Sequence, residues 1–297
     1  MENYLHLIKG AYDLHIHSGP DLLPRKIDDL EMAERIKISG MAGFSMQSHY
    51  FATGERAKIV NKLYPDCHAV GTIVLNQYVG GINPAAVEVA ARSETKIVWF
   101  PTQDSSHARS DIFDSGKPLE KLPFWAKILM EMKEENKLPP SINILQDGKL
   151  IDSVYDVLDT IAKHNMMLVT GNISHPECFA LVKEAHKRKV EKILIALVDH
   201  PSVNYTIEQQ KELAGYGAYM EHCYNTWSSN KVDLAETINQ IRTMGADRVV
   251  LSTDLGQKKN IFPDEGMLHF AAELSKAGFS HKDILKMTAH NSRNLIS

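Results

Sequence analysis

The stretch Ala11-Tyr12-Asp13-Leu14-His15-Ile16-His17 opens the pattern that decides the fold. It is rich in β-forming residues, it ends on polar ones, and an amphipathic helical stretch follows it over about 27–36. His15 and His17 are two residues apart, so on a strand both side chains point to the same face. We therefore expect a strand that ends on two neighbouring imidazoles and leads into a helix.

The same alternation then continues along the chain. Further β-rich runs cover residues 43–49, 68–75, 96–101, 166–170, 192–198, 218–221 and 248–252. Helical stretches follow at about 54–63, from Asn83-Pro84 onward, and at 151–161, from 176, at 206–214, 234–244 and 265–276. Strand-helix repetition of this kind predicts parallel strands with right-handed crossovers.

Two parallel architectures are compatible with these elements, a closed barrel and a doubly wound open sheet. No Gly-x-Gly-x-x-Gly turn follows the first strand, and no phosphate-binding Gly-x-x-x-x-Gly-Lys-Ser/Thr loop is present. The count of eight strands and eight helices favours an α/β fold of the (β/α)₈, or TIM, barrel type. We expect residues 1–297 to form a single domain of this kind.

Two segments depart from the simple repeat. Residues 103–150 form an insertion after the fourth strand, with a helix expected at about 123–136, a break at Pro139-Pro140 and a hairpin around Asp147-Gly148. The insertion is either an active-site cover or a decorated surface loop. Residues 281–297 add a C-terminal helical extension.

Composition narrows the function classes. The chain is 43% hydrophobic and 24% charged, its formal net charge is −4, and no basic stripe suits nucleic acid. The cysteines, Cys67, Cys178 and Cys223, form no CxxC pair. Residues 1–10 do not resemble a signal peptide, and no apolar run approaches the roughly 18–20 residues of a membrane span. These features predict a cytoplasmic enzyme with a small-molecule substrate, and self-association stays open.

In such a barrel the active site lies at the C-terminal ends of the strands. The residues expected there are His15, His17, His49, Thr102, Asn172, His200, Glu221 and Asp254. Four of these eight are histidines, although the whole chain has 14. Neighbouring imidazoles suit zinc and similar divalent ions. His200 could supply a third nitrogen ligand, and the Asp254 carboxylate could reach both the ion and its water.

Each of these residues also has a structural interpretation. His49 contacts the metal directly, binds a substrate group or caps its strand. His200, before Pro201, could be a turn residue, and Asp254 could be an N-cap. Glu221 beside His222 is either functional or one half of a polar pair.

The strand-end set resembles that of the amidohydrolase superfamily of metal-dependent hydrolases. The shared features are His15-x-His17, a sixth-strand His200, an eighth-strand Asp254 and the closing helix of residues 287–295. The resemblance runs from about residue 11 to the C-terminus. Within the superfamily it is closest to an uncharacterised branch of cytosolic amidohydrolase-like proteins, through segments 79–84, 98–102 and 254–257.

Two departures from that pattern bear on the metal. Relatives tend to carry a histidine where this chain has Asn172, and a lysine where it has Gln47. The resemblance therefore implies one divalent ion rather than two, zinc before manganese, held by His15, His17, His200 and Asp254.

The predicted reaction is hydrolysis of a carbonyl-type bond, in an amide, cyclic amide, lactone or ester. Asp254 would exchange the proton of a metal-activated water, with His49 beside it as a second catalytic residue. Asn172, Glu221, Arg109 and Lys258, with Lys259 beside it, would bind substrate. The alternatives are a phosphoesterase of similar architecture and a non-catalytic barrel with a degenerate metal site.

Overall fold

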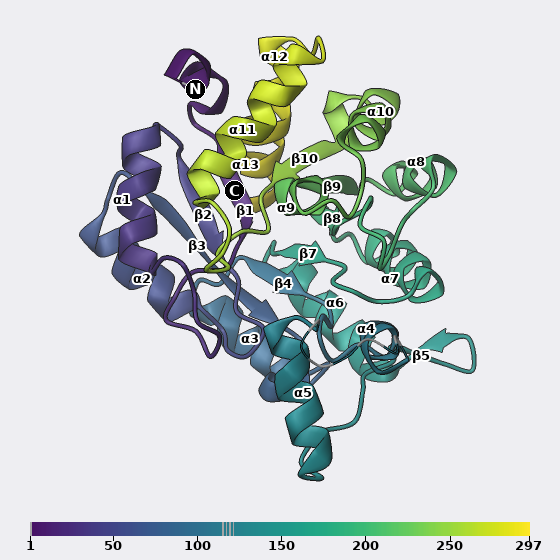
Figure 1. Cartoon of the computed structure of the whole chain (residues 1–297). Helices are drawn as coiled ribbons and strands as arrows, with labels where there is room; N and C mark the ends of the chain where they lie inside the picture. The colour runs from purple at the N-terminus through teal and green to yellow at the C-terminus, as the bar shows by residue number, and fades with distance from the viewer. Residues whose placement is uncertain (1, 115, 117, 119, 121) are drawn as a thin grey trace.

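The computed structural model describes residues 2–114, 116, 118, 120 and 122–297, and it contains a barrel of parallel strands ringed by helices (Figure 1). Eight strands follow one another around the barrel in the order β1, β2, β3, β4, β7, β8, β9, β10. Their bounds are β1 Tyr12–Ile16, β2 Gly43–Met46, β3 His68–Val74, β4 Ile97–Trp99, β7 Met167–Val169, β8 Ile193–Ile195, β9 Tyr219–Cys223 and β10 Val249–Ser252. Every neighbouring pair in that order is parallel, which confirms the predicted (β/α)₈ barrel.

The barrel closes between its first and last strands just beyond the end of β10. Asp254 N donates to His15 O at 2.9 Å, and His17 N donates to Leu255 O at 2.8 Å. Gly256, with a φ of 129°, allows this approach, because a Cβ atom there would lie 1.8 Å from the carbonyl oxygen of His17. The seam of the barrel therefore runs through the segments that carry His15, His17 and Asp254.

Helices alternate with the strands as predicted. They are α1 Asp29–Ser39, α2 Gly54–Leu63, α3 Pro84–Arg92, α6 Asp152–Lys163, α7 His175–Lys187, α8 Ile207–Gly215, α10 Leu234–Met244 and α11 Pro263–Lys276. The start of α3 is as the sequence indicates: the Asn83 side chain accepts from Ala86 N, and Pro84 occupies the first turn. A short helix that the sequence did not reveal, α9 (Tyr224–Ser228), follows β9 directly.

The strands are buried on both faces. Apolar side chains of β4, β7 and β8 are between 0 and 1% exposed, as expected for strands covered by helices outside and packed within. Burial also includes polar residues: every residue of β1 is buried, Asp13 and His15 among them. The apolar core thus fixes the strands, and the polar residues cluster at their carboxyl ends.

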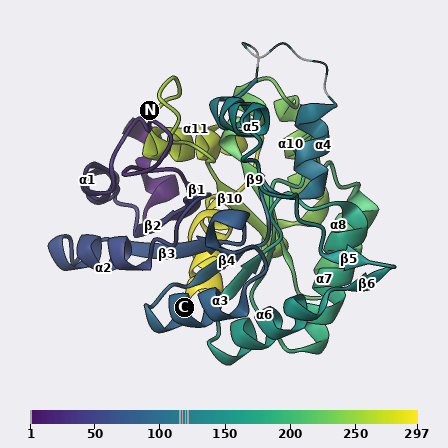
Figure 2. The same cartoon turned by 90° about the horizontal axis from the view of Figure 1, so that it is seen from below.

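The insertion after β4 carries two helices and a hairpin. They are α4 Ser106–Phe113, α5 Phe124–Glu134, and the antiparallel pair β5 Leu145–Gln146 and β6 Lys149–Leu150. The predicted hairpin turn is confirmed, since Asp147 and Gly148 have φ angles of 50° and 75°. The hairpin lies at the edge of the molecule in Figure 2, and α5 extends away from the barrel in Figure 1. The helix α4 was not predicted.

The C-terminal extension is helical, as predicted. It consists of α12 His281–Leu285, a π-turn η5 Lys286–His290 and α13 Asn291–Ile296. A 3₁₀ turn at the other end of the chain, η1 Glu2–Ile8, contacts α11 and α12. Within the described part of the chain, no helix combines the length and apolar character needed to cross a membrane.

Candidate metal centre

Two segments bring the first three side chains of the site together. His15 lies in β1 and His17 just after it, and their ring centroids are 5.4 Å apart, with 3% and 4% of each residue exposed. Asp254 follows β10 and adopts a φ of 52°, in the left-handed region that a non-glycine residue seldom occupies. This turn directs its carboxylate toward both imidazoles.

The three side chains converge on one oxygen. Nε2 of His17 lies 3.2 Å from Oδ1 of Asp254, and Nε2 of His15 lies 3.6 Å from the same atom. Potential ligand atoms of His15, His17 and Asp254 all fall within 4.8 Å of one another. Two imidazoles and a carboxylate are ligands that suit zinc and other divalent transition metals.

The contact at Nδ1 of each imidazole determines the role of Nε2, the nitrogen that faces the Asp254 carboxylate. Nδ1 of His15 lies 3.2 Å from Oε2 of Glu221, and Nδ1 of His17 lies 3.3 Å from the backbone oxygen of Gln47. The oxygens of Glu221 and Gln47 face the Nδ1 atoms, so Nε2 is the nitrogen of each ring that can offer a lone pair to a cation. On His15, whose pKa is raised, a bound cation would take the place of the Nε2 proton, and both Nε2 atoms would then flank the cation together with Oδ1 of Asp254. The residues present therefore fit a divalent metal.

The pKa values of the site residues also indicate a site for a cation. Burial lowers the pKa of His15, but the carboxylates of Glu221 and Asp254 outweigh it and raise that pKa to about 9. Burial alone would raise the pKa of Asp254, yet His15 and His17 hold it well below its ordinary value. Burial and the Arg25 guanidinium lower the pKa of His17. The two carboxylates thus create a site that attracts positive charge.

Glu221 lies deeper than the sequence suggested. The strand β9 continues to Cys223, so Glu221 is inside the strand rather than at its end, and it is fully buried. It forms a second group of potential ligands with His15 and Cys223, whose Sγ is 3.7 Å from Nδ1 of His15. Burial and the nearby carboxylates raise the pKa of the Cys223 thiol well above its ordinary value, so the thiol is protonated in the metal-free protein. The contact with Nδ1 lets Glu221 orient His15 from within the strand.

His49 stands beside His17. Their ring centroids are 5.1 Å apart, and Nδ1 of His49 lies 2.9 Å from Oγ1 of Thr102. The Asn76 amide fixes Thr102 in turn, with its Nδ2 donating to Oγ1 at 2.9 Å. Burial, followed by the charges of His17 and Arg25, lowers the pKa of His49 well below its ordinary value, so this imidazole is neutral near pH 7. His49 is in neither group of potential ligands formed by the described residues.

His200 is also outside both groups. It lies five residues beyond the end of β8, in a turn, and its Nδ1 accepts from Ser202 N at 3.1 Å. That bond places the ring proton on Nε2, which makes Nε2 a donor rather than a metal ligand in this conformation. Burial, followed by the charge of Lys231, lowers the pKa of His200 to about 4, so the ring is neutral.

The other predicted substrate-binding residues are dispersed. Arg109 is buried in α4, where its Nη2 donates to Asp104 Oδ1 and its Nη1 to Pro139 O, both at 2.5 Å. Because both bonds hold the guanidinium inside the insertion, we no longer propose Arg109 as a substrate-binding residue. Asn172 is half-buried and its backbone binds Pro101 and Ser105, while Lys258 and Lys259 are exposed.

The structure adds residues that the strand-end pattern did not identify. Nδ2 of Asn225, in α9, donates to Oδ2 of Asp254 at 3.0 Å, which leaves Oδ1 for the imidazoles. Asp13 bonds the backbone of Thr253 at 3.1 Å and its hydroxyl at 2.5 Å, across the seam. Both amide atoms of Gln47 are sealed from solvent without a partner among the described residues. Asp13 lies two residues before His15 in the first predicted strand, whereas Asn225 carried no signal.

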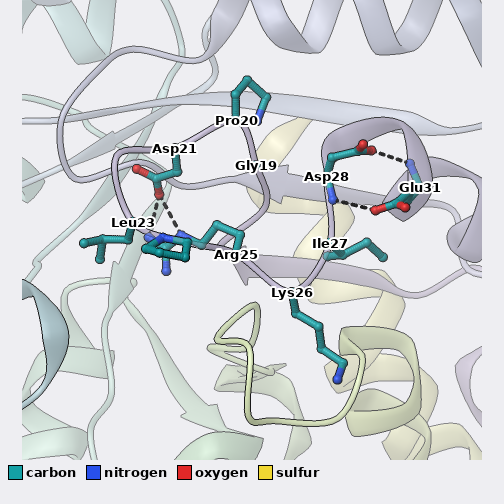
Figure 3. A pocket seen from close by; sticks show the side chains of 10 residues that line it. Gly19, Pro20, Asp21, Leu23, Arg25, Lys26, Ile27, Asp28 and Glu31 are labelled. Carbon is teal, nitrogen blue, oxygen red and sulfur yellow. Dashed lines mark hydrogen bonds and ion pairs between the residues drawn. The ribbon is translucent and has the colours of Figure 1, made fainter.

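A hollow lies beside the centre, in the loop between β1 and α1 (Figure 3). It is lined by Gly19, Pro20, Asp21, Leu23, Pro24, Arg25, Lys26, Ile27, Asp28 and Glu31. None of the three converging side chains lines it. Figure 3 shows Asp21 and Arg25 turned toward each other at one end, and Asp28 with Glu31 at the other.

Comparison with known proteins yields one family and a common fold. Residues 10–221 match DUF6282, described as a family of unknown function. The matched span includes His15, His17, His49 and His200 and ends at Glu221, before Asp254. No curated protein matches the sequence.

Solved structures with a similar barrel cover nearly all of the chain. An amidohydrolase from Pseudomonas aeruginosa aligns with a TM-score of 0.60 at 12% identity, over 99% of this chain and 97% of that one. A lactonase from Listeria monocytogenes aligns with a TM-score of 0.55 at 14% identity, over 98% and 96%. An organophosphorus hydrolase from Deinococcus radiodurans aligns with a TM-score of 0.61 at 12% identity, over 98% and 94%. At these identities the likeness confirms the barrel fold.

Proposed function

We propose that this chain, which belongs to DUF6282, a family of unknown function, is a metal-dependent hydrolase of small molecules. The bond cleaved is a carbonyl-type C–N or C–O bond, in an amide, cyclic amide, lactone or ester. The observation that carries the proposal is the convergence of Nε2 of His15 and Nε2 of His17 on Oδ1 of Asp254.

One divalent ion, zinc before manganese, would be held by His15, His17 and Asp254. Bound there, such an ion supplies Lewis-acid activation of water and of a carbonyl oxygen. A single ion is favoured because Nδ1 of His15 is engaged by Glu221, which leaves His15 one nitrogen for a metal. Glu221 and the backbone oxygen of Gln47 act as the orienting acceptors that histidine ligands require.

Asp254 is the proposed proton acceptor. Its carboxylate is ionised at neutral pH, and Asn225 holds Oδ2 at 3.0 Å, so that Oδ1 stays directed into the site. From there it would take the proton of the attacking water and return it to the leaving group.

Two neutral imidazoles are the proposed substrate donors. His49 is anchored through Nδ1 to Thr102, and His200 presents a protonated Nε2 because its Nδ1 accepts from Ser202. Neutral donors of this kind suit the carbonyl oxygen and leaving group of an uncharged scissile bond. In this proposal His49 is catalytic through the substrate, and Asn172 and Lys258 contact the substrate's distal parts.

The solved structures of similar fold guide the choice of assay. They include an amidohydrolase, a lactonase and an organophosphorus hydrolase, so a panel should contain N-acyl amino acids, cyclic amides, lactones and phosphotriesters. Zinc-loaded protein is expected to turn over a carbonyl substrate, and Asp254→Asn to abolish that turnover with an unchanged circular dichroism spectrum. Turnover that survives Asp254→Asn would refute the role of Asp254, and turnover of phosphotriesters alone would favour the phosphoesterase alternative.

A further inference from the structure

A buried ion pair stands in the loop between β1 and α1. Nε and Nη2 of Arg25 both donate to Oδ2 of Asp21, at 2.8 and 2.5 Å. The side chains are 5% and 0% exposed, and Figure 3 shows them facing each other across the loop. Two bonds to one carboxylate hold the guanidinium plane in a single orientation.

Backbone pairing places this loop against the one that carries Asp254. Arg25 forms an antiparallel bridge with Gln257, and Lys26 N donates to Gly256 O at 2.8 Å. Nε2 of Gln257 in turn donates to the backbone oxygen of Asp254 at 2.9 Å. Gln257 lies three residues after Asp254, so this pairing fixes Arg25 beside the segment that carries the third ligand.

One edge of the guanidinium is free. Nη1 of Arg25 bonds no residue that the structure describes, and it is not among the side-chain atoms sealed from solvent. Arginine has only donors, so the partner of this edge must be an acceptor. Neighbouring cations are already engaged: Arg56 bonds Asp29, and Lys26 lies over the ring of Phe262.

Two observations indicate the chemical class of the group that Nη1 of Arg25 would bind. Asp21 neutralises much of the guanidinium charge, which suits a monoanionic carboxylate better than a doubly charged phosphate. At the other end of the hollow, the oxygens of Asp28 and Glu31 accept from each other's backbone at the start of α1. Their negative charge disfavours an anion within the hollow, so the acceptor approaches Arg25 from the side of the centre.

We propose that Arg25, oriented by Asp21, binds a carboxylate of the substrate while the scissile group lies at His15, His17 and Asp254. The substrate class is then a small carboxylic acid that also carries a hydrolysable amide or ester bond. This rests on the proposed function only for the position of the scissile group, since the carboxylate contact needs no metal.

The probes are simple acids, and the readout is binding. Malonate, succinate and glutarate are titrated into zinc-loaded protein by calorimetry, with butyrate as the monocarboxylate that lacks a second charge. Arg25→Gln is expected to weaken the best diacid about tenfold or more, the loss typical of a charge-assisted hydrogen bond, and to change butyrate binding less than twofold. Arg35→Gln, which removes another two-bond arginine–aspartate pair, is the matched control and should leave both unchanged.

The proposal would be overturned if Arg25→Gln weakened binding of the diacid and of butyrate equally, or weakened neither. A larger loss for inorganic phosphate than for the diacid would also overturn it. If Arg25→Gln does not fold, ¹⁵N spectra of wild-type arginine side chains decide: the diacid should shift one buried Nε signal that butyrate leaves in place, and no shift would overturn the assignment.

Repeating the titration on metal-free protein separates this proposal from the metal centre. A chain that binds no zinc, yet loses weak diacid affinity on Arg25→Gln, keeps the carboxylate contact and refutes the metal. A chain that binds zinc, but whose diacid affinity is unchanged by Arg25→Gln, keeps the metal centre and refutes the carboxylate contact.

Discussion

Nε2 of His17 lies 3.2 Å from Oδ1 of Asp254, although 237 positions separate the two residues in the chain. Nδ1 of the same ring lies 3.3 Å from a backbone oxygen, so the nitrogen that faces the carboxylate carries a lone pair. His15 has the same orientation, with Glu221 in place of the backbone oxygen, and a cation would displace the Nε2 proton that its raised pKa retains. Both Nε2 atoms are thus directed at the same carboxylate oxygen, and this convergence predicts a cation site.

Glu221 should affect metal affinity without contacting the metal. Glu221→Gln keeps an acceptor near Nδ1 of His15 but removes the charge, and orienting partners of this kind typically account for about 10- to 100-fold in affinity. We expect zinc affinity, measured by competition with a chelating dye, to fall at least about tenfold. Glu177→Gln changes another buried carboxylate, at the start of α7, and should leave zinc affinity unchanged. Equal zinc affinity in wild type and Glu221→Gln would argue against the orienting role.

Gly256 should be needed for closure of the barrel. An alanine Cβ would lie 1.8 Å from the His17 carbonyl oxygen, at a φ of 129°. Gly278 also has a positive φ, 90°, but nothing lies within 4 Å of the same position. Gly256→Ala should therefore lower the free energy of unfolding by at least about 2 kcal/mol more than Gly278→Ala, measured by urea denaturation. Similar losses in the two variants would contradict this account of the seam.

Substitution of Arg109 should lower the stability of the fold and leave zinc binding unchanged. Arg109→Met leaves Asp104 buried without its charge partner, which costs about 3 kcal/mol or more. Arg92→Met breaks an exposed pair with Glu88 and should cost less than about 1 kcal/mol. Zinc stoichiometry should stay the same in both. A loss of bound zinc or of ligand affinity in a folded Arg109→Met protein would restore Arg109 as a substrate residue.

Asp13 should make metal-free protein less stable as pH rises. Burial outweighs the hydrogen bonds from Thr253 and His15 and raises the pKa of Asp13 to about 7. An unfolded aspartate titrates near about 3.9, so between about pH 4 and pH 7 the folded chain binds one more proton than the unfolded chain. The stabilisation is fully present below about pH 4 and is lost as pH rises through about 7, at up to about 1.4 kcal/mol per pH unit.

Asp13→Asn mimics the protonated acid, so its stability relative to the wild type should rise with pH between 4.5 and 7.5 in urea denaturation. The lowered pKa values of His17, His49 and His200 contribute the opposite slope, and they do so in both proteins. The exposed Glu34→Gln serves as the control and should keep the wild-type slope. A wild-type slope in Asp13→Asn would assign the pH dependence to another group.

The barrel could be predicted because its signal is local and repeated. Buried parallel strands such as Ile97–Trp99 are continuous apolar runs, and the pair Asn83-Pro84 predicts the start of α3. The adjacency of His15 and His17 followed from strand geometry alone. Their meeting with Asp254 required the order of the strands, which the count of elements supplied.

The rest depended on contacts that no local pattern encodes. Glu221 was placed at a strand end because β9 extends two residues further than its composition suggests. His200 was predicted as a third nitrogen ligand, and no local pattern revealed the turn after β8 in which Ser202 N donates to its Nδ1. Arg25 lies in a loop without periodicity, and only the pairing of that loop with Gln257 brings its charge near His17.

Zinc binding by the purified chain tests the central claim most directly. After chelation and dialysis against zinc, elemental analysis should find about one ion per wild-type chain. His17→Ala and Asp254→Ala should retain almost none, because each removes a ligand from the converging set. His164→Ala, which changes a histidine paired with Glu88 outside the centre, should retain the ion. A wild-type chain that binds neither zinc nor manganese, or His17→Ala and Asp254→Ala variants that keep a full ion, would contradict the account.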